Sequence, residues 1–226
     1  MKKILSFNRL SLILISLFAS LIPISAQTDS LANMPNMVLP TFTKAIVKMK
    51  TGTSYHAVMN YEMSDQEMIV LRKGQYFVLN DQKMVDTITI GNRIFVPIEN
   101  SFYELLVQGP ADLLVKHQGT LESEGSTLAY GAKSTAAGIT HITTIYGKEG
   151  AIDLKVPENF KFKDASQTWI RKDATMIKFS NKKQLMKIFA DSEKDLNLFI
   201  DSNNIDFKKT GDLVKLVSYY NKLQVK

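Results

Sequence analysis

The sequence contains no cysteine among its 226 residues. This absence excludes disulfide bonds, thiolate zinc sites, cysteine nucleophiles and cysteine-ligated iron–sulfur clusters. It also excludes a lipid anchor attached to a cysteine just after an export signal. A chain of this length can fold without disulfides, because it is long enough to bury a sizeable hydrophobic core.

The sequence also lacks the familiar signatures of catalysis and cofactor binding. No serine lies in a G-x-S-x-G elbow, and no glycine-rich stretch matches a phosphate loop or a dinucleotide-binding fingerprint. The segment 201–207 (DSNNIDF) offers oxygen ligands but lacks the glycine and the final glutamate of an EF-hand loop. Glu122 and Glu124 are neighbours in a loop-like stretch, whereas a glycosidase needs two carboxylates in a defined cleft.

Histidine is scarce, with only His56, His117 and His141 in the chain. None of the three lies at metal-ligand spacing from another histidine or a carboxylate. We therefore predict no catalytic, cofactor-binding or metal-binding residues and no cofactor, and we expect a protein that is not an enzyme. A three-histidine site that is assembled only in the folded chain stays open as an alternative.

Neither sign of charge is in large excess. The chain has 28 Lys and Arg against 22 Asp and Glu. Lys2, Lys3 and Arg9 lie in a segment that we expect to be removed, which leaves 25 basic and 22 acidic side chains. A balance this small does not indicate nucleic acid as a partner, because a nucleic-acid-binding face needs clustered cations.

Residues 1–26 have the pattern of a bacterial secretory signal peptide. Three basic residues precede the apolar run at 10–22 (LSLILISLFASLI), Pro23 breaks that run, and Ala26 offers a cleavage point. The run is shorter than the roughly 18–20 apolar residues that span a bilayer, so we favour cleavage over an uncleaved anchor. We predict an exported protein, periplasmic or extracellular, with no transmembrane segment after signal removal.

Residues 43–117 consist of short β-like segments separated by turn residues. At the start of this region, Ala45 and Val47 alternate with lysines, as in a strand with one solvent-exposed face. The pair at 91–92 (Gly-Asn) is typical of a two-residue hairpin turn. The regular spacing of turns favours antiparallel pairing of neighbouring strands over βαβ units. We predict an antiparallel β-meander that forms a strongly curved sheet or a partly closed barrel.

Less regular segments flank this region within a mainly β domain at residues 43–175. Residues 27–42 are expected to form a flexible N-terminal arm. Residues 118–150 are rich in Gly, Ser, Thr and Ala and predict a polar connector, either mobile or folded over the sheet as a lid. Trp169, the only tryptophan, is expected to anchor the packing of a further strand.

Residues 176–226 predict two or three short helices, which makes the fold class α+β. Asn181, Ser192 and Thr210 each precede a segment of helical periodicity and can cap it. The last segment carries an apolar stripe made of Leu213, Leu216, Val217, Tyr220 and Leu223. Short helices are marginal alone in water, so we expect the stripe to pack within the protein, with a docking face for a partner as the alternative.

Three stretches form a shared pattern: KTGTSYHAVMNYEMSDQEMIVL, VDTITIGNRIFVPIENSFYELL and KDLNLFIDSNNIDFKKTGDLVKLVSYYN. Together they resemble a family of uncharacterised secreted proteins of Bacteroidetes-type bacteria. The resemblance covers most of the chain after the signal. It implies an envelope or exported protein, and because the family has no assigned activity, it transfers no functional residues.

Three functional hypotheses follow, in decreasing order of preference. The first is a non-enzymatic binding or interaction module of the cell envelope, whose partner is an envelope protein or another macromolecule. The second is a carrier whose curved sheet encloses an apolar ligand, which requires a continuous apolar cavity. The third is an enzyme of unrecognised type, which requires a cleft where a histidine meets a carboxylate. The strands are rich in aromatic residues that predict either core packing or a ligand-gripping face: Tyr55, Tyr61, Phe77, Phe95, Phe102 and Tyr103.

Overall fold

The structure is a computed structural model of the chain, and it describes residues 34–123, 126–127, 133–134, 145–146, 151–154 and 160–225. The expected signal peptide lies outside the described residues. The described part of the N-terminal arm lies against the sheet, where the Leu39 N–H donates to Asn60 Oδ1 at 3.0 Å and Asn60 Nδ2 donates to the Leu39 carbonyl at 2.8 Å.

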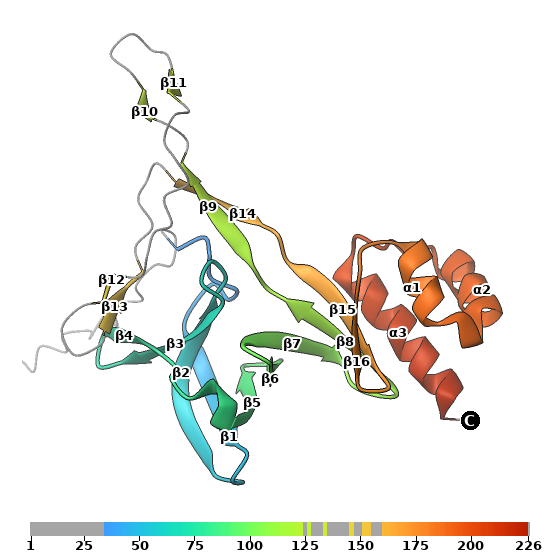
Figure 1. Cartoon of the computed structure of the whole chain (residues 1–226), viewed down its shortest axis with the longest axis horizontal. Helices are drawn as coiled ribbons and strands as arrows, with labels where there is room; N and C mark the ends of the chain where they lie inside the picture. Colours follow the sequence, from blue (N-terminus) through green and yellow to red (C-terminus); the bar gives the residue numbers. More distant parts are fainter. Residues whose placement is uncertain are drawn as a thin grey trace, which may run out of the picture.

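A twelve-stranded antiparallel sheet dominates the fold (Figure 1). The predicted β region supplies β1 (Thr43–Met49), β2 (Ser54–Glu62), β3 (Glu67–Arg72), β4 (Gln75–Val78), β5 (Val85–Ile90), β6 (Arg93–Ile98), β7 (Ser101–Val107) and β8 (Ala111–Lys116). Later segments add β12 (Ile145–Tyr146), β13 (Ala151–Asp153), β15 (Gln167–Lys172) and β16 (Thr175–Phe179). The predicted α+β class with a large antiparallel sheet is confirmed.

The strand order is β12-β13-β4-β3-β2-β1-β5-β6-β7-β8-β15-β16. Two meanders, β1 to β4 and β5 to β8, therefore join side by side through β1 and β5. The expectation of one continuous meander fails at this point, because the chain after β4 passes through a 3-10 turn (η2, Gln82–Met84) and returns beside β1 instead of pairing with β4. Elsewhere the predicted turns do close hairpins, as at Gly91, whose φ is +60°.

The sheet is neither closed nor strongly curled, so the predicted strongly curved sheet or partly closed barrel is wrong. Closure requires the two end strands to pair, and the end strands β12 and β16 are not neighbours in the strand order. β16 is instead followed at once by a helix that lies beside the sheet (Figure 1).

A two-stranded arm extends from the end of β8 and β15. It consists of β9 (Gly119–Ser123) paired with β14 (Phe160–Asp164), and a short ladder of β10 (Ser126–Thr127) with β11 (Lys133–Ser134) lies beyond it. Figure 1 shows the arm running diagonally away from the sheet. The start of the expected polar connector at 118–150 is thus strand, and most of the rest lies outside the described residues.

The C-terminal block forms the predicted helices, α1 (Lys182–Ile188), α2 (Glu193–Asn203) and α3 (Thr210–Gln224), with a 3-10 turn, η4 (Ala190–Ser192), between the first two. Their apolar faces pack on the β8, β15 and β16 end of the sheet. This first core includes Ala111 and Ile170 from the strands and Leu196, Leu216 and Tyr220 from the helices. Four residues of the expected apolar stripe of the last helix, Leu213, Leu216, Val217 and Tyr220, are therefore core, whereas Leu223 is only partly buried. None of the described helices combines the length and apolar character needed to cross a membrane.

A second core lies over the β1, β2, β3, β5 and β6 part of the sheet. Its fully buried members include Met59, Tyr61, Ile88 and Phe95. The buried side chains of neighbouring strands share one face, because pairs such as Ile88 and Phe95 lie opposite each other in the register. The opposite face is exposed at Ile46 and Ile94, but a third, smaller core covers it at β3, where Ile69 packs with Met34, Met37 and Leu154.

Candidate functional site

The three histidines do not converge. His56 is exposed on β2, His117 is partly buried just after β8, and His141 lies outside the described residues. The described residues contain no group of three or more His, Asp and Glu side chains that could hold a metal ion.

The aromatic residues of the strands lie mainly in the core. Tyr61, Phe95, Phe102 and Tyr103 are buried, whereas Tyr55 is 57% exposed. The only tryptophan, expected as a packing anchor, packs edge-on against the Tyr103 ring at 6.1 Å between centroids. The aromatics therefore do not form a common exposed face that could grip a ligand.

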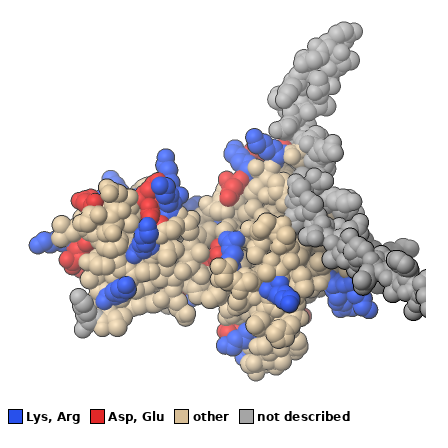
Figure 2. Space-filling model, turned by 180° about the vertical axis from the view of Figure 1, so that it is seen from behind, with Lys and Arg blue, Asp and Glu red and all other residues tan. Residues whose placement is uncertain are grey.

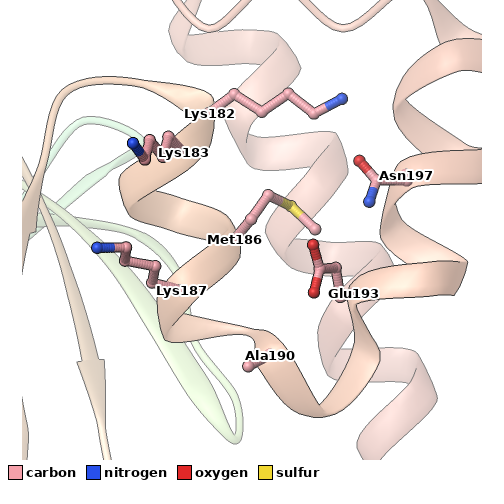
Figure 3. A pocket seen from close by; sticks show the side chains of 7 residues that line it. All are labelled: Lys182, Lys183, Met186, Lys187, Ala190, Glu193 and Asn197. Atoms are coloured by element: carbon pink, nitrogen blue, oxygen red, sulfur yellow. The ribbon is translucent and has the colours of Figure 1, made fainter.

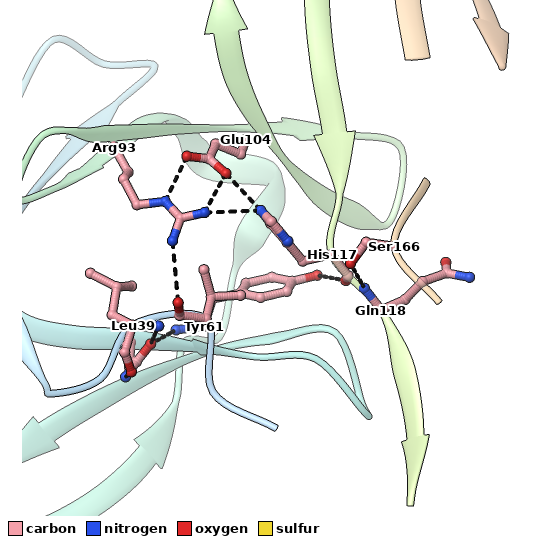
Figure 4. Close-up of polar contacts among 9 residues, drawn as sticks. Leu39, Tyr61, Arg93, Glu104, His117, Gln118 and Ser166 are labelled. Carbon is pink, nitrogen blue, oxygen red and sulfur yellow. Dashed lines mark hydrogen bonds and ion pairs between the residues drawn. The ribbon is translucent and has the colours of Figure 1, made fainter. Parts of the chain in front are cut away.

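One histidine does meet a carboxylate, inside a buried ion cluster (Figure 4). Arg93 Nε and Nη2 donate to the two carboxylate oxygens of Glu104, each at 2.6 Å. His117 Nε2 lies 2.6 Å from the same carboxylate and 3.3 Å from Arg93 Nη2. A third arginine nitrogen, Nη1, donates to the Val38 carbonyl at 3.2 Å, and the Tyr61 hydroxyl donates to the His117 carbonyl at 3.2 Å.

Burial alone would raise the pKa of Glu104, but the hydrogen bonds and charges of Arg93 and His117 outweigh it and lower the pKa to about 2. The carboxylate is therefore ionised and fully occupied by donors, which makes it a poor proton acceptor. The side chain of Arg93 is 28% exposed, that of Glu104 is 6% exposed and that of His117 is 15% exposed. The cluster is best explained as a structural link between β6, β7, the end of β8 and the N-terminal segment.

The sequence carried a partial signal for this cluster. The turn at 99–100 sets the β6–β7 register and places Glu104 opposite Phe95, one diagonal step from Arg93. The position of His117 was not deducible, because β7 and β8 change register between Leu105 and Val107.

Glu62 is a second buried carboxylate, at the end of β2. The backbone N–H groups of Ser64 and Asp65 donate to it at 2.7 and 2.6 Å, and the Asn36 amide donates to it as well. Burial raises the pKa of Glu62 and outweighs the opposing effect of these hydrogen bonds. This carboxylate links the N-terminal segment to the sheet, and its oxygens already accept hydrogen bonds from the protein, so a structural role explains it.

A first hollow on the described surface lies between α1 and α2 and has a volume of about 580 Å³ (Figure 3). Met186 points into the space between the two helices, with Glu193 and Asn197 on the α2 side and Lys182 reaching toward α2, while Lys183 and Lys187 lie at the outer side of α1 (Figure 3). Figure 2 shows charges of both signs interspersed over this helical block. This hollow therefore combines three lysines with an acidic residue, and it has no uniform charge that would select a ligand.

The second hollow, of about 660 Å³, lies between β2 and β3. Only residues 59–62 of β2 pair with β3, whereas residues 54–58 pair with β1 alone. Beyond Met59 the two strands diverge, and Figure 1 shows the β1–β2 hairpin pointing downward while β4 runs to the left. We call this hollow the strand wedge; residues 44–45, 56–58 and 70–73 line it.

The strand wedge offers both backbone and charge. Alternate N–H and C=O groups of a strand point to each of its edges, so part of the 54–58 backbone faces the wedge without a strand partner in the described chain. Lys44, His56, Arg72 and Lys73 are exposed around it, and no acidic residue lines it. It is therefore the candidate binding site.

Comparison with protein-family models, curated proteins and solved structures found no match for this chain. The function is therefore inferred from the geometry of the strand wedge and not from similarity to a characterised protein. The family resemblance drawn from the sequence stays a prediction.

Proposed function

We propose that this chain is an exported, non-enzymatic interaction module that binds a partner protein by adding one strand of that partner to the free edge of β2. The observation that supports the proposal is the divergence of β2 and β3, which leaves residues 54–58 paired on one side only. A run of five residues is a normal strand length, so it can pair with a short extended segment.

Unpaired strand edges attract other strands, because each backbone N–H and C=O group gains a hydrogen bond when a new strand is added. This mode of recognition takes affinity from the main chain and specificity from pockets beside it. The wedge supplies such a pocket on the open side of β2. It also limits the length of the added strand, because β3 closes the edge at Met59.

The open sheet does not provide the enclosing shape that the carrier hypothesis requires. That hypothesis required a curved sheet around a continuous apolar cavity, and the sheet is open. The middle of the second core is filled by side chains such as Tyr61 and Phe95, whose rings stack at 5.8 Å between centroids. We therefore do not propose a carrier.

Site-directed photocrosslinking in the native cells tests the proposal, and the chain suits it because it has no cysteine of its own. A benzophenone is attached to a single cysteine introduced as Val58→Cys in the wedge. We expect one discrete adduct, with the crosslinked site in an extended segment of a single protein.

The matched control is Leu198→Cys, an exposed apolar position on α2 that is 61% exposed. It should give no specific adduct. Equal adduct patterns from both positions, or an adduct whose crosslinked residue lies in a helix of the partner, would contradict strand addition.

A further inference from the structure

We infer that the segment taken up by the strand wedge alternates acidic and small apolar side chains. This inference rests on the proposed strand addition and adds the chemistry of the partner. It follows from how the lining residues divide between the two faces of the sheet.

The cations of β1 and β2 lie on one face of the wedge. Lys44 lies opposite Val58 in the β1–β2 register, and His56, two residues before Val58, shares that face. Lys73 is two residues beyond Leu71 and lies in the exposed turn after β3. A strand added to β2 would direct every second side chain toward these basic groups.

The other face of the wedge is mainly apolar and continues into the second core, although Arg72, two residues after Val70, also lies on it. Ala45 lies opposite Ala57 in the register, and Ala45 is buried. Ala57 and Val70 are partly buried and pack against the second core. The intervening side chains of an added strand would meet this surface, where small apolar residues would be removed from water and extend the core.

The cations of the wedge have no carboxylate partner within the described part of the chain. Several other lysines of the described chain are in ion pairs, such as Lys48 with Asp86 at 3.3 Å and Lys172 with Asp191 at 2.7 Å. No carboxylate of the described chain lies within ion-pairing distance of Lys44, Arg72 or Lys73. The Arg72 guanidinium lies over the Phe77 ring at 5.8 Å, an arrangement that leaves its N–H edges available.

Three labelled hexapeptides test the inference against residues 27–226: (Glu-Val)3, (Lys-Val)3 and a (Glu-Val)3 that is N-methylated at every residue. Fluorescence anisotropy measures the affinity of each at low and at physiological salt. We expect the acidic peptide to bind about tenfold or more tightly than the basic one, with the difference shrinking as salt screens the charges. N-methylation should abolish binding, because it removes the donors that pair with β2.

The double variant Lys44→Glu with Lys73→Glu should lose the acidic peptide, whereas Arg72→Glu, on the mainly apolar face, should weaken it less. The control Lys182→Glu with Lys183→Glu changes the net charge equally in the helical hollow and should leave binding unchanged. Equal binding of the acidic and basic peptides would overturn the inference while leaving strand addition intact. Unimpaired binding of the N-methylated peptide would overturn strand addition itself. Binding to vesicles rich in phosphatidylglycerol but to neither acidic peptide would overturn the inference in favour of a lipid surface.

Discussion

Glu104 shows how this protein tolerates a buried charge. Its carboxylate accepts from both Arg93 nitrogens and lies against His117, so the cost of removing the charge from water is offset by donors on two sides. Glu62 is buried to a similar degree but has backbone and amide donors in place of a cation. The two carboxylates therefore differ in sign of pKa shift, downward for Glu104 and upward for Glu62.

This difference predicts how stability depends on pH. The pKa of Glu104 is about 2 in the folded chain, against 4.5 as the reference value for an unfolded one. A group with a depressed folded pKa stabilises the fold above its unfolded pKa, and that stability is lost as pH falls from about 4.5 to 2. In urea unfolding across this range, Glu104→Gln should remove an acid-sensitive contribution of about 3 kcal/mol.

The control is Glu122→Gln, at a carboxylate that is 57% exposed and forms a surface pair with Lys163. Its stability profile should run parallel to that of the unchanged chain, since exposed pairs contribute little. A Glu104→Gln profile that also ran parallel would show that the buried ion cluster does not stabilise the folded chain through this carboxylate.

At the scale of elements, the β9–β14 arm depends on a close approach at Gly119. A Cβ at this position would lie 2.2 Å from the Phe162 ring and 2.5 Å from the Lys163 carbonyl oxygen. Both contacts come from β14, the strand paired with β9. Only glycine therefore allows the two strands to pair at the base of the arm.

We predict that Gly119→Ala destabilises the arm. The overpacking should cost about 1–3 kcal/mol, because a backbone carbonyl cannot move aside as a flexible side chain can. Hydrogen exchange of the amides in 119–123 and 160–164 should become faster, while exchange in the helical block stays unchanged.

Gly211 provides the matched control, since nothing lies within 4 Å of a Cβ added there and the residue lies in the first turn of α3. Gly211→Ala should be neutral or raise stability by up to about 1 kcal/mol through its better helix propensity. Equal stability and equal hydrogen exchange of the two alanine variants would show that the close approach at Gly119 does not affect the free energy of folding.

At the scale of the whole molecule, the helical block completes a core that the sheet begins. Leu113, Ile170 and Phe179 on the strands are buried against helix residues such as Phe189 and Leu216. Asn221 of α3 is also hydrogen-bonded to β8. Its side chain accepts from the Ala111 N–H and donates to the Ala111 carbonyl, both at 2.8 Å. The sheet is therefore not expected to be stable alone.

Removal of residues 181–226 should expose this apolar surface and lower the urea midpoint, because each large apolar side chain contributes about 2 kcal/mol when buried. The truncated chain should also bind the dye ANS more strongly than the full chain. Deletion of residues 225–226 alone is the control, because Val225 is 78% exposed and adds little to the core. An unchanged midpoint after the large deletion would show that the sheet is an independent folding unit.

Sequence patterns predicted helix caps correctly where the cap depends only on neighbouring residues. The Asn181 side chain caps α1 by accepting from the Gln184 N–H at 3.0 Å, as its sequence context predicts. The predicted cap at Thr210 is wrong, since α3 begins at this residue and Lys209 occupies the cap position without a side-chain bond. The exact residue at which a helix begins depends on the direction of the chain that leads into it. The local sequence does not predict that direction.

The sequence by itself determined the α+β class, the hairpins and the C-terminal helices, because alternation, turn chemistry and caps act over a few residues. The tertiary structure decided what depends on distant residues: the pairing of β1 with β5, the open sheet and the buried cluster around Glu104. It alone revealed the strand wedge, because the length of pairing between β2 and β3 follows from how the two hairpins twist apart.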